Sequence, residues 1–226
     1  MIVGNGLIAN LFKNYDDENI VFFASGVSNS LENNKLNFER EENLVRKTLA
    51  ENPYKLFIYF STCSIYDSSK TESLYVLHKL NMESIVSKNA QKYLILRVSN
   101  AVGKGGNPNL LLNFIFESLR QKKTIQVHQK ATRNLIDSHD IQQITLSLIA
   151  RKKQNVIVNL AYLHELTIQE IIETMSSVLQ IQPKMKFIES GNFYQIAIPD
   201  IKDYFEAKKL TDKKKYLQEM VKKYYL

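Results

Sequence analysis

The chain has 226 residues, of which 44% are hydrophobic and 10% aromatic. A chain of this length buries roughly 70% or more of its unfolded surface, so it can form a core without disulfides or a structural metal. It contains no apolar run of 18 residues and no N-terminal signal of basic residues followed by apolar ones. We therefore expect a soluble, cytoplasmic protein without a membrane-spanning segment.

The formal net charge is +7, and lysines and tyrosines alternate in the C-terminal segment 207–225. Such a pattern is found in proteins that bind single-stranded nucleic acid. The apolar residues of this segment, however, recur at helical spacing and leave the lysines on a solvated face. We predict no nucleic-acid partner, and we expect the positive field to favour an anionic small molecule.

The four histidines show no metal-ligand spacing, so no metal is predicted. Cys63 is the single cysteine and cannot form an intramolecular disulfide. We interpret it as a small buried side chain without a catalytic role.

The first predicted elements are a strand at 1–3 and a helix near 6–15, joined by the sequence Gly4-Asn5-Gly6-Leu7-Ile8-Ala9. In this G-x-G-x-x-A pattern, Gly4 permits a tight turn and Gly6 lets the backbone approach a pyrophosphate. The helix N-terminus then directs N–H groups at the anion. The alternative is an ordinary strand-turn-helix unit of an α/β domain.

Further along the chain, strands and helices alternate, which predicts an α/β fold with a parallel sheet. The expected strands lie near 20–24, 55–61, 92–98, 124–128 and 155–160, and the expected helices near 40–51, 73–89, 110–120 and 140–151. Thr167 and Glu170 form a capping-box pattern at the start of another helix.

Tyr75 and Lys79 are four residues apart on one of these helices, so their side chains share a face. An ammonium group beside a phenol lowers the phenol pKa, which starts near 10. A hydroxyl at the end of the preceding strand, from Thr62 or Ser61, could bind the same substrate oxygen. The pattern predicts an alcohol/ketone oxidoreduction site, whereas the alternative is a pair of packing residues.

Several segments follow one another in the order of a known family. They are Ala24-Ser25-Gly26 after a strand, Ser61-Thr62 at a strand end, Tyr75 with Lys79, Leu96-Arg97-Val98-Ser99-Asn100 ahead of Gly103, and Arg133 through Asp140. On these motifs the chain resembles the extended short-chain dehydrogenase/reductase family, the NAD-dependent nucleotide-sugar epimerase, dehydratase and reductase group. The resemblance implies a Rossmann-like doubly wound sheet and an NAD or NADP cofactor.

The resemblance also implies roles for individual residues. The catalytic residues would be Thr62, Tyr75 and Lys79. The cofactor would be bound by Gly4, Asn5, Gly6, Leu7, Ile8, Ala24, Ser25, Gly26, Ser61, Tyr75 and Lys79. The nucleotide-sugar substrate would be bound by Ser64, Asn100 and Arg133. Arg97 is expected to form an internal salt bridge. The implied reaction is a C4 keto-reduction or an epimerisation in polysaccharide biosynthesis.

The resemblance implies a core at 1–102 and 134–161 and a small substrate lobe at 103–133 and 162–226. The connection at 14–19 is short, so the second and third strands of the usual sheet are expected to be missing. In relatives this region binds adenine and distinguishes NAD from NADP. The alternative function is therefore a non-redox or non-catalytic nucleotide-sugar binder.

Two other departures bear on function. Cys63 stands where the 4,6-dehydratase branch has an acidic residue, which argues against a dehydratase. The helix at 73–89 has more apolar residues than one sheet contact needs. Its excess fits a homodimer interface or, equally, a buried core face.

Overall fold

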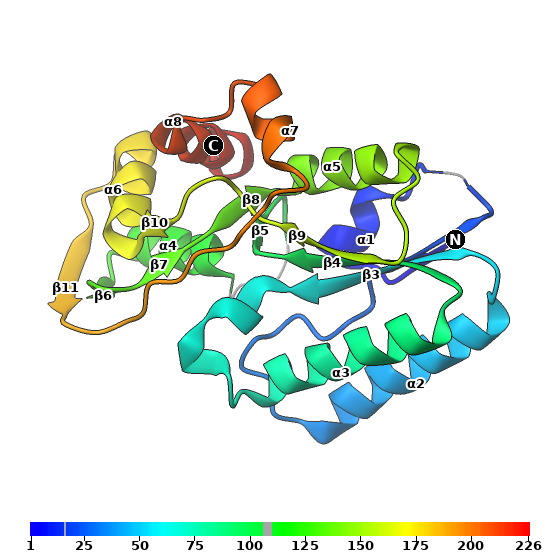
Figure 1. Cartoon of the computed structure of the whole chain (residues 1–226). Helices are drawn as coiled ribbons and strands as arrows, with labels where there is room; N and C mark the ends of the chain where they lie inside the picture. Colours follow the sequence, from blue (N-terminus) through cyan, green and yellow to red (C-terminus); the bar gives the residue numbers. More distant parts are fainter. Residues whose placement is uncertain (16, 106–109) are drawn as a thin grey trace. The chain divides into compact units, whose positions relative to one another are not determined.

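The computed structural model describes residues 1–15, 17–105 and 110–226 (Figure 1). The chain forms two compact units. Unit 1 contains Met1–Val98 and Ser138–Leu160, and unit 2 contains Ser99–Asp137 and Ala161–Leu226. Residue 16 of the short connection and residues 106–109 of the expected substrate lobe lie outside the described residues.

Unit 1 is built on a five-stranded sheet in which every neighbouring pair is parallel. The strand order is β1 (Ile2–Val3), β2 (Ile20–Phe23), β3 (Leu56–Thr62), β4 (Lys92–Val98) and β9 (Val156–Leu160). The parallel α/β fold predicted from the sequence is confirmed.

The position of β1 confirms the expected loss of two strands. In a complete doubly wound sheet of order 3-2-1-4-5-6, the first strand lies in the middle. Here β1 pairs with β2, and among the described residues no strand pairs with its other side. The first strand has therefore become an edge strand.

Helices cover both faces of this sheet (Figure 1). Helices α2 (Lys35–Glu51) and α3 (Leu74–Asn89) lie on one face, and α1 (Leu7–Leu11) and α5 (Ser138–Ala150) lie on the other. Helix α2 starts five residues earlier than predicted because the side chain of Asn34 accepts a hydrogen bond from the Leu36 N–H and caps it. Helix α1 is shorter than predicted.

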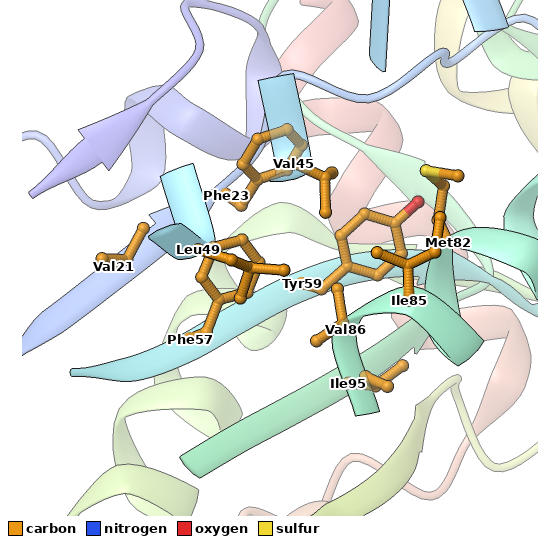
Figure 2. Packing of buried hydrophobic residues seen from close by; sticks show 10 residues of the cluster. All are labelled: Val21, Phe23, Val45, Leu49, Phe57, Tyr59, Met82, Ile85, Val86 and Ile95. Carbon is orange, nitrogen blue, oxygen red and sulfur yellow. The ribbon is translucent and has the colours of Figure 1, made fainter. Parts of the chain in front are cut away.

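A hydrophobic core lies between β2, β3 and β4 and the helices α2 and α3 (Figure 2). It consists of Val21, Phe23, Val45, Leu49, Phe57, Tyr59, Met82, Ile85, Val86 and Ile95. The Phe23 ring stacks on Phe57, with 5.7 Å between centroids. Tyr59 brings a polar hydroxyl into this apolar layer, so that group needs a buried partner.

The described residues of unit 2 form three pairs of short strands. They are β5 (Asn100–Val102) with β8 (Leu135–Asp137), β7 (Thr132–Arg133) with β10 (Leu166–Thr167), and β6 (Thr124–His128) with β11 (Lys184–Ile188). Its helices are α4 (Leu111–Arg120), α6 (Ile168–Leu179), α7 (Lys202–Ala207) and α8 (Lys213–Tyr225). The predicted capping box of α6 is confirmed, since Thr167 and Glu170 exchange both hydrogen bonds.

Helix α8 buries the apolar face predicted for the C-terminal segment, through Tyr216, Leu217, Met220 and Val221. Two of its lysines form ion pairs with other elements of unit 2, Lys213 with Glu170 at 2.6 Å and Lys223 with Asp137 at 3.0 Å. In the part of the chain that is described, no helix is long and apolar enough to cross a membrane.

Two isoleucines paired in register test the packing of this core. Ile95 on β4 is fully buried, whereas its partner Ile157 on β9 is 42% exposed. We expect Ile95→Ala to lower the free energy of unfolding by about 2–5 kcal/mol, because it leaves a cavity. Ile157→Ala is the matched control. Urea unfolding should show that it lowers the free energy of unfolding by well under half as much as Ile95→Ala. Equal losses would contradict this description of the core.

Candidate active site

Three predicted catalytic residues come together at the carboxyl end of β3 in unit 1. Thr62 ends this strand, and its hydroxyl oxygen accepts a hydrogen bond of 3.0 Å from the Ser64 N–H, which starts a 3-10 turn at Cys63–Tyr66. Tyr75 and Lys79 lie on α3 and are both buried, with exposures of 6% and 2%. The Thr62 hydroxyl acts on the Tyr75 phenol in the direction that lowers its pKa.

The environment of Tyr75 does not match the expectation that Lys79 lowers its pKa. Burial raises the pKa of Tyr75 to about 12; the hydrogen bond from Thr62 lowers it, and the charge of Glu41 raises it. The Lys79 ammonium lies 5.9 Å from the centre of the Tyr75 ring. The direction of this shift contradicts the prediction of a phenol made acidic by Lys79.

The reason is that Lys79 is bonded elsewhere. Its ammonium donates to Glu41 Oε1 at 2.9 Å and to the Tyr59 hydroxyl at 3.2 Å. Burial lowers the pKa of Lys79, while the charge of Glu41 opposes this effect. Since an ammonium has three donors, one N–H of Lys79 remains beyond these two bonds.

Glu41, on α2, is fully buried and holds four groups from three other segments. It accepts hydrogen bonds from the Val27 N–H at 2.6 Å, the Tyr59 hydroxyl at 2.7 Å and Lys79, and His78 Nε2 lies 3.0 Å from its second oxygen. We call these five residues the Glu41 cluster. Burial by itself would raise the pKa of Glu41, but these bonds and the Lys79 charge hold it well below its usual value.

Glu41 is not among the residues predicted from the sequence, although the sequence contains a signal for it. Glu41 shares the buried stripe of α2 with Val45, Thr48 and Leu49. A carboxylate at helical spacing with residues that face the core needs a buried partner. That partner is Lys79.

The glycine turn has the geometry that a dinucleotide site requires. Gly4 has a φ of +126°, and a Cβ there would collide with the Ala24 carbonyl oxygen, so the close approach of β1 to the end of β2 needs glycine. Gly6 precedes α1, and a Cβ placed there would meet no atom within 4 Å. The remaining residues predicted here for cofactor binding, Asn5, Leu7 and Ile8, belong to the same turn and to the start of α1.

The other predicted cofactor residues follow β2. A Cβ on Gly26 would collide with Lys79 Nζ and would lie 2.8 Å from Glu41 Oε1, so this loop packs directly on the ion pair. Arg40 donates hydrogen bonds to the carbonyl and hydroxyl oxygens of Ser25 at 3.0 and 3.3 Å. Ser25 is thus held by α2, and Gly26 packs against side chains of both α2 and α3.

A second buried carboxylate engages Ser61 and Arg97. The Ser61 hydroxyl donates to Glu83 at 2.5 Å, and Arg97 donates to both Glu83 oxygens at 2.9 and 2.6 Å. The internal salt bridge expected for Arg97 is therefore confirmed. The buried Cys63 thiol donates to the Arg97 carbonyl, and burial raises its pKa.

The predicted substrate residues Asn100 and Arg133 belong to unit 2. Asn100 on β5 donates its side-chain amide to the Asn134 carbonyl at 2.8 Å, and half-buried Arg133 donates to the Thr132 carbonyl at 2.7 Å. Across the described ranges, histidine, cysteine and carboxylate side chains form no group of three or more that could hold a metal ion.

A parallel α/β unit with a glycine turn after its first strand and a Thr-Tyr-Lys constellation at a strand end defines a Rossmann-like protein. The family model "NAD dependent epimerase/dehydratase family" matches residues 5–161, which is more than half of the chain. The protein belongs to this family. No curated protein matches the chain.

Solved structures share the fold at low sequence identity. RMD from Pseudomonas aeruginosa complexed with NADPH has a TM-score of 0.70 and 14% identity, over 97% of this chain and 86% of that one. UDP-glucuronic acid 4-epimerase from Bacillus cereus, in complex with UDP-glucuronic acid and NAD, has a TM-score of 0.71 and 18% sequence identity. The match covers 98% of this chain and 77% of that one. dTDP-glucose 4,6-dehydratase from Bacillus anthracis, in complex with NAD, has a TM-score of 0.72 and 15% sequence identity. The match covers 96% of this chain and 75% of that one.

The lowered pKa of Glu41 predicts a pH-dependent stability. A carboxyl group whose pKa is depressed on folding stabilises the protein above its unfolded pKa, and this contribution is lost as the pH falls below that value. We expect Glu41→Gln to lower the free energy of unfolding by about 3–5 kcal/mol near pH 7, because the substitution leaves the buried Lys79 charge unpaired. The difference from wild type should shrink below about pH 4.5.

Urea unfolding between pH 3 and pH 7 would measure this difference. Glu39→Gln, at an exposed site on the same helix, is the matched control and should cost little at any pH. A cost of Glu41→Gln that stays constant across this range would contradict an ionised, buried Glu41.

Proposed function

We propose that the protein is an NAD(P)-dependent oxidoreductase that acts on a nucleotide-linked sugar, as a C4 keto-reductase or an epimerase. The observation that supports this most is the grouping of Thr62, which ends β3, with Tyr75 and Lys79, which are both buried on one face of α3. Membership of the NAD dependent epimerase/dehydratase family supports the same class of reaction.

The residues present fit a dinucleotide. The open space at Gly6 and the collision that a Cβ would cause at Gly4 match a turn over which a pyrophosphate lies. Gly4, Asn5, Gly6, Leu7 and Ile8 would hold this part of the cofactor. Ala24, Ser25, Gly26, Ser61, Tyr75 and the third N–H of Lys79 would hold the nicotinamide half.

In the proposed reduction, the cofactor held by these residues would supply the hydride for the keto carbon. Tyr75 donates its phenol proton to the substrate oxygen, which becomes the alcohol. The Thr62 oxygen already accepts the Ser64 N–H, so its hydroxyl hydrogen is available to Tyr75 or to the substrate oxygen. An epimerase would first run this step in reverse and then reduce the other face of the sugar.

A second candidate is a nucleotide-sugar binder without redox chemistry. It is favoured by the edge position of β1, since the region that binds adenine in complete doubly wound folds would follow this strand. Weakened adenine contacts would reduce affinity for NAD and NADP without affecting sugar recognition.

Roles for Ser64, Asn100 and Arg133 in substrate binding remain predictions, as do polysaccharide biosynthesis and a cytoplasmic location. Helix α3 buries Val76, Met82, Ile85 and Val86 but leaves Leu74, Leu77 and Leu80 exposed. These three leucines support the proposal that the protein forms a homodimer.

Removing the phenol hydroxyl of Tyr75 tests the mechanism. We expect Tyr75→Phe to fold like the wild type and to lower turnover at least about a hundredfold, because it removes the proton donor. The assay is NADH or NADPH consumption with a 4-keto nucleotide sugar, and conversion of UDP-galactose. Tyr93→Phe, on β4, is the matched control. An unchanged rate in Tyr75→Phe would overturn the proposed mechanism.

Calorimetric titration with NADH and NADPH tests the cofactor site. We expect micromolar binding of one of them to the wild type and at least about tenfold weaker binding to Gly6→Val, because the added side chain fills space without a clash in the free protein. Unaltered circular dichroism would show that the variant is folded. Binding of a UDP-sugar without binding of either dinucleotide would favour the non-redox candidate.

A further inference from the structure

Arg40 on α2 lies beside the part of unit 1 that is proposed to hold the dinucleotide. Its guanidinium donates hydrogen bonds to the Ser25 carbonyl at 3.0 Å and to the Ser25 hydroxyl at 3.3 Å. The loop that contains Ser25 continues β2, and the Ala24 N–H donates to the Val3 carbonyl at 2.8 Å. A Cβ on Gly4 would lie 3.0 Å from the Ser25 nitrogen. Ser25 therefore contacts Arg40 and also lies next to the glycine turn.

The glycine turn and α1 contribute no basic side chain to the pyrophosphate that they are proposed to bind. Residues 4–12 contain no lysine or arginine. Helix α1 has five residues, so few peptide dipoles add up at its N-terminus. Because a pyrophosphate is negatively charged, we expect a cation from another element to complete this site.

The charge of Arg40 is available for such a ligand. Arg40 is exposed, and in the described part of the chain no carboxylate lies within ion-pair distance of it. Arg46 on the same helix differs, since it lies 2.8 Å from Glu42. A guanidinium has five N–H donors, and the bonds to Ser25 use two of them. The others belong to a planar fork that suits the paired oxygens of a phosphate group.

The bonds to Ser25 also restrict the position of the guanidinium. A free arginine side chain loses conformational entropy when it binds a ligand. Arg40 has already lost part of this freedom in the unliganded protein, so its remaining donors are preorganised. Lys79 packs against Gly26, the next residue of the loop, and is assigned to the nicotinamide half in the proposed function. The neighbouring pyrophosphate is left to Arg40.

We propose that Arg40 is a cofactor-binding residue whose guanidinium binds the pyrophosphate of NAD or NADP beside Ser25. This inference rests on the proposed function and deepens it, because it names the source of positive charge at the glycine turn. A nucleotide sugar also contains a pyrophosphate. The glycine turn next to Ser25 is typical of a dinucleotide site, however, and this position assigns Arg40 to the cofactor.

Calorimetric titration of Arg40→Gln with NADH, NADPH and ADP-ribose tests the proposal. Glutamine keeps an N–H donor for Ser25 but removes the charge. We expect the affinity for the dinucleotide that the wild type binds to fall at least about tenfold, because a charge-assisted contact is lost. The affinity for ADP-ribose should fall by a similar factor, since this ligand keeps the pyrophosphate and lacks the nicotinamide. The affinity for a UDP-sugar should not change.

Arg46→Gln is the matched control, because it removes an exposed arginine from the same helix. It should bind the dinucleotide and ADP-ribose like the wild type. Equal dinucleotide affinities of Arg40→Gln and wild type would overturn the proposal, and so would a loss confined to the UDP-sugar.

The salt dependence of binding separates a contact with the pyrophosphate from a role in holding the loop. Salt screens the attraction between an exposed cation and an anion, so wild-type affinity should fall between about 50 and about 500 mM NaCl. The fall should be smaller in Arg40→Gln, whereas Arg40→Lys keeps the charge and should retain the wild-type salt dependence. Weaker binding by Arg40→Gln with an unaltered salt dependence would overturn the proposal, since Arg40 would then act only through Ser25.

Arginine-specific labelling of the wild-type protein tests the same contact without any variant. Phenylglyoxal reacts with exposed guanidinium groups, and mass spectrometry distinguishes Arg40 from Arg46, which are both exposed. We expect a saturating concentration of the dinucleotide to slow the labelling of Arg40 several-fold and to leave that of Arg46 unchanged. Labelling of Arg40 at the same rate with and without the dinucleotide would overturn the proposal, whether or not any variant folds.

Failure of this inference and failure of the proposed function give different results. If wild type and Arg40→Gln bind the dinucleotide equally well, the role of Arg40 is refuted and the proposed oxidoreductase stands. If the wild type binds neither NADH nor NADPH, the proposed function fails and the role of Arg40 fails with it.

Discussion

A single buried carboxylate connects the segments that form the candidate active site. Glu41 joins α2 to the loop after β2 through the Val27 N–H, to β3 through Tyr59, and to α3 through His78 and Lys79. Such a group is tolerated in a core only when its hydrogen-bonding capacity is satisfied. The positions of the Gly26 loop, the Tyr59 hydroxyl and the Lys79 ammonium all depend on this requirement.

The shortened N-terminal region limits the fold in another way. With β1 at the edge of the sheet, the turn from Gly4 to Ile8 keeps its contact with the end of β2, while the described residues contain no strand on the other side of β1. The part of the site expected to hold a nicotinamide depends on β2, β3 and α3, all of which are present. Under the proposed function, the chemistry and the recognition of adenine would thus depend on different strands.

Much of the local structure could be predicted from the sequence because it rests on short-range patterns. The alternation of strands and helices, the capping box at Thr167 and the shared face of Tyr75 and Lys79 each depend on residues only a few positions apart. The two- and three-residue strands of unit 2 were missed, since so few residues show no periodicity. The early start of α2 was missed because the Asn34 cap precedes its apolar stripe.

The sequence by itself determined the class of fold, the family resemblance and the candidate Thr62, Tyr75 and Lys79 site, because these follow from hydrophobic periodicity and ordered motifs. Only the tertiary structure decided which group Lys79 binds. Glu41 and Lys79 are 38 residues apart, and no local rule pairs them. Their pairing arises because α2 and α3 pack on the same face of the sheet, where a buried charge without an oppositely charged partner would be strongly destabilising. The electrostatic environment of Lys79 is therefore a property of the packed unit.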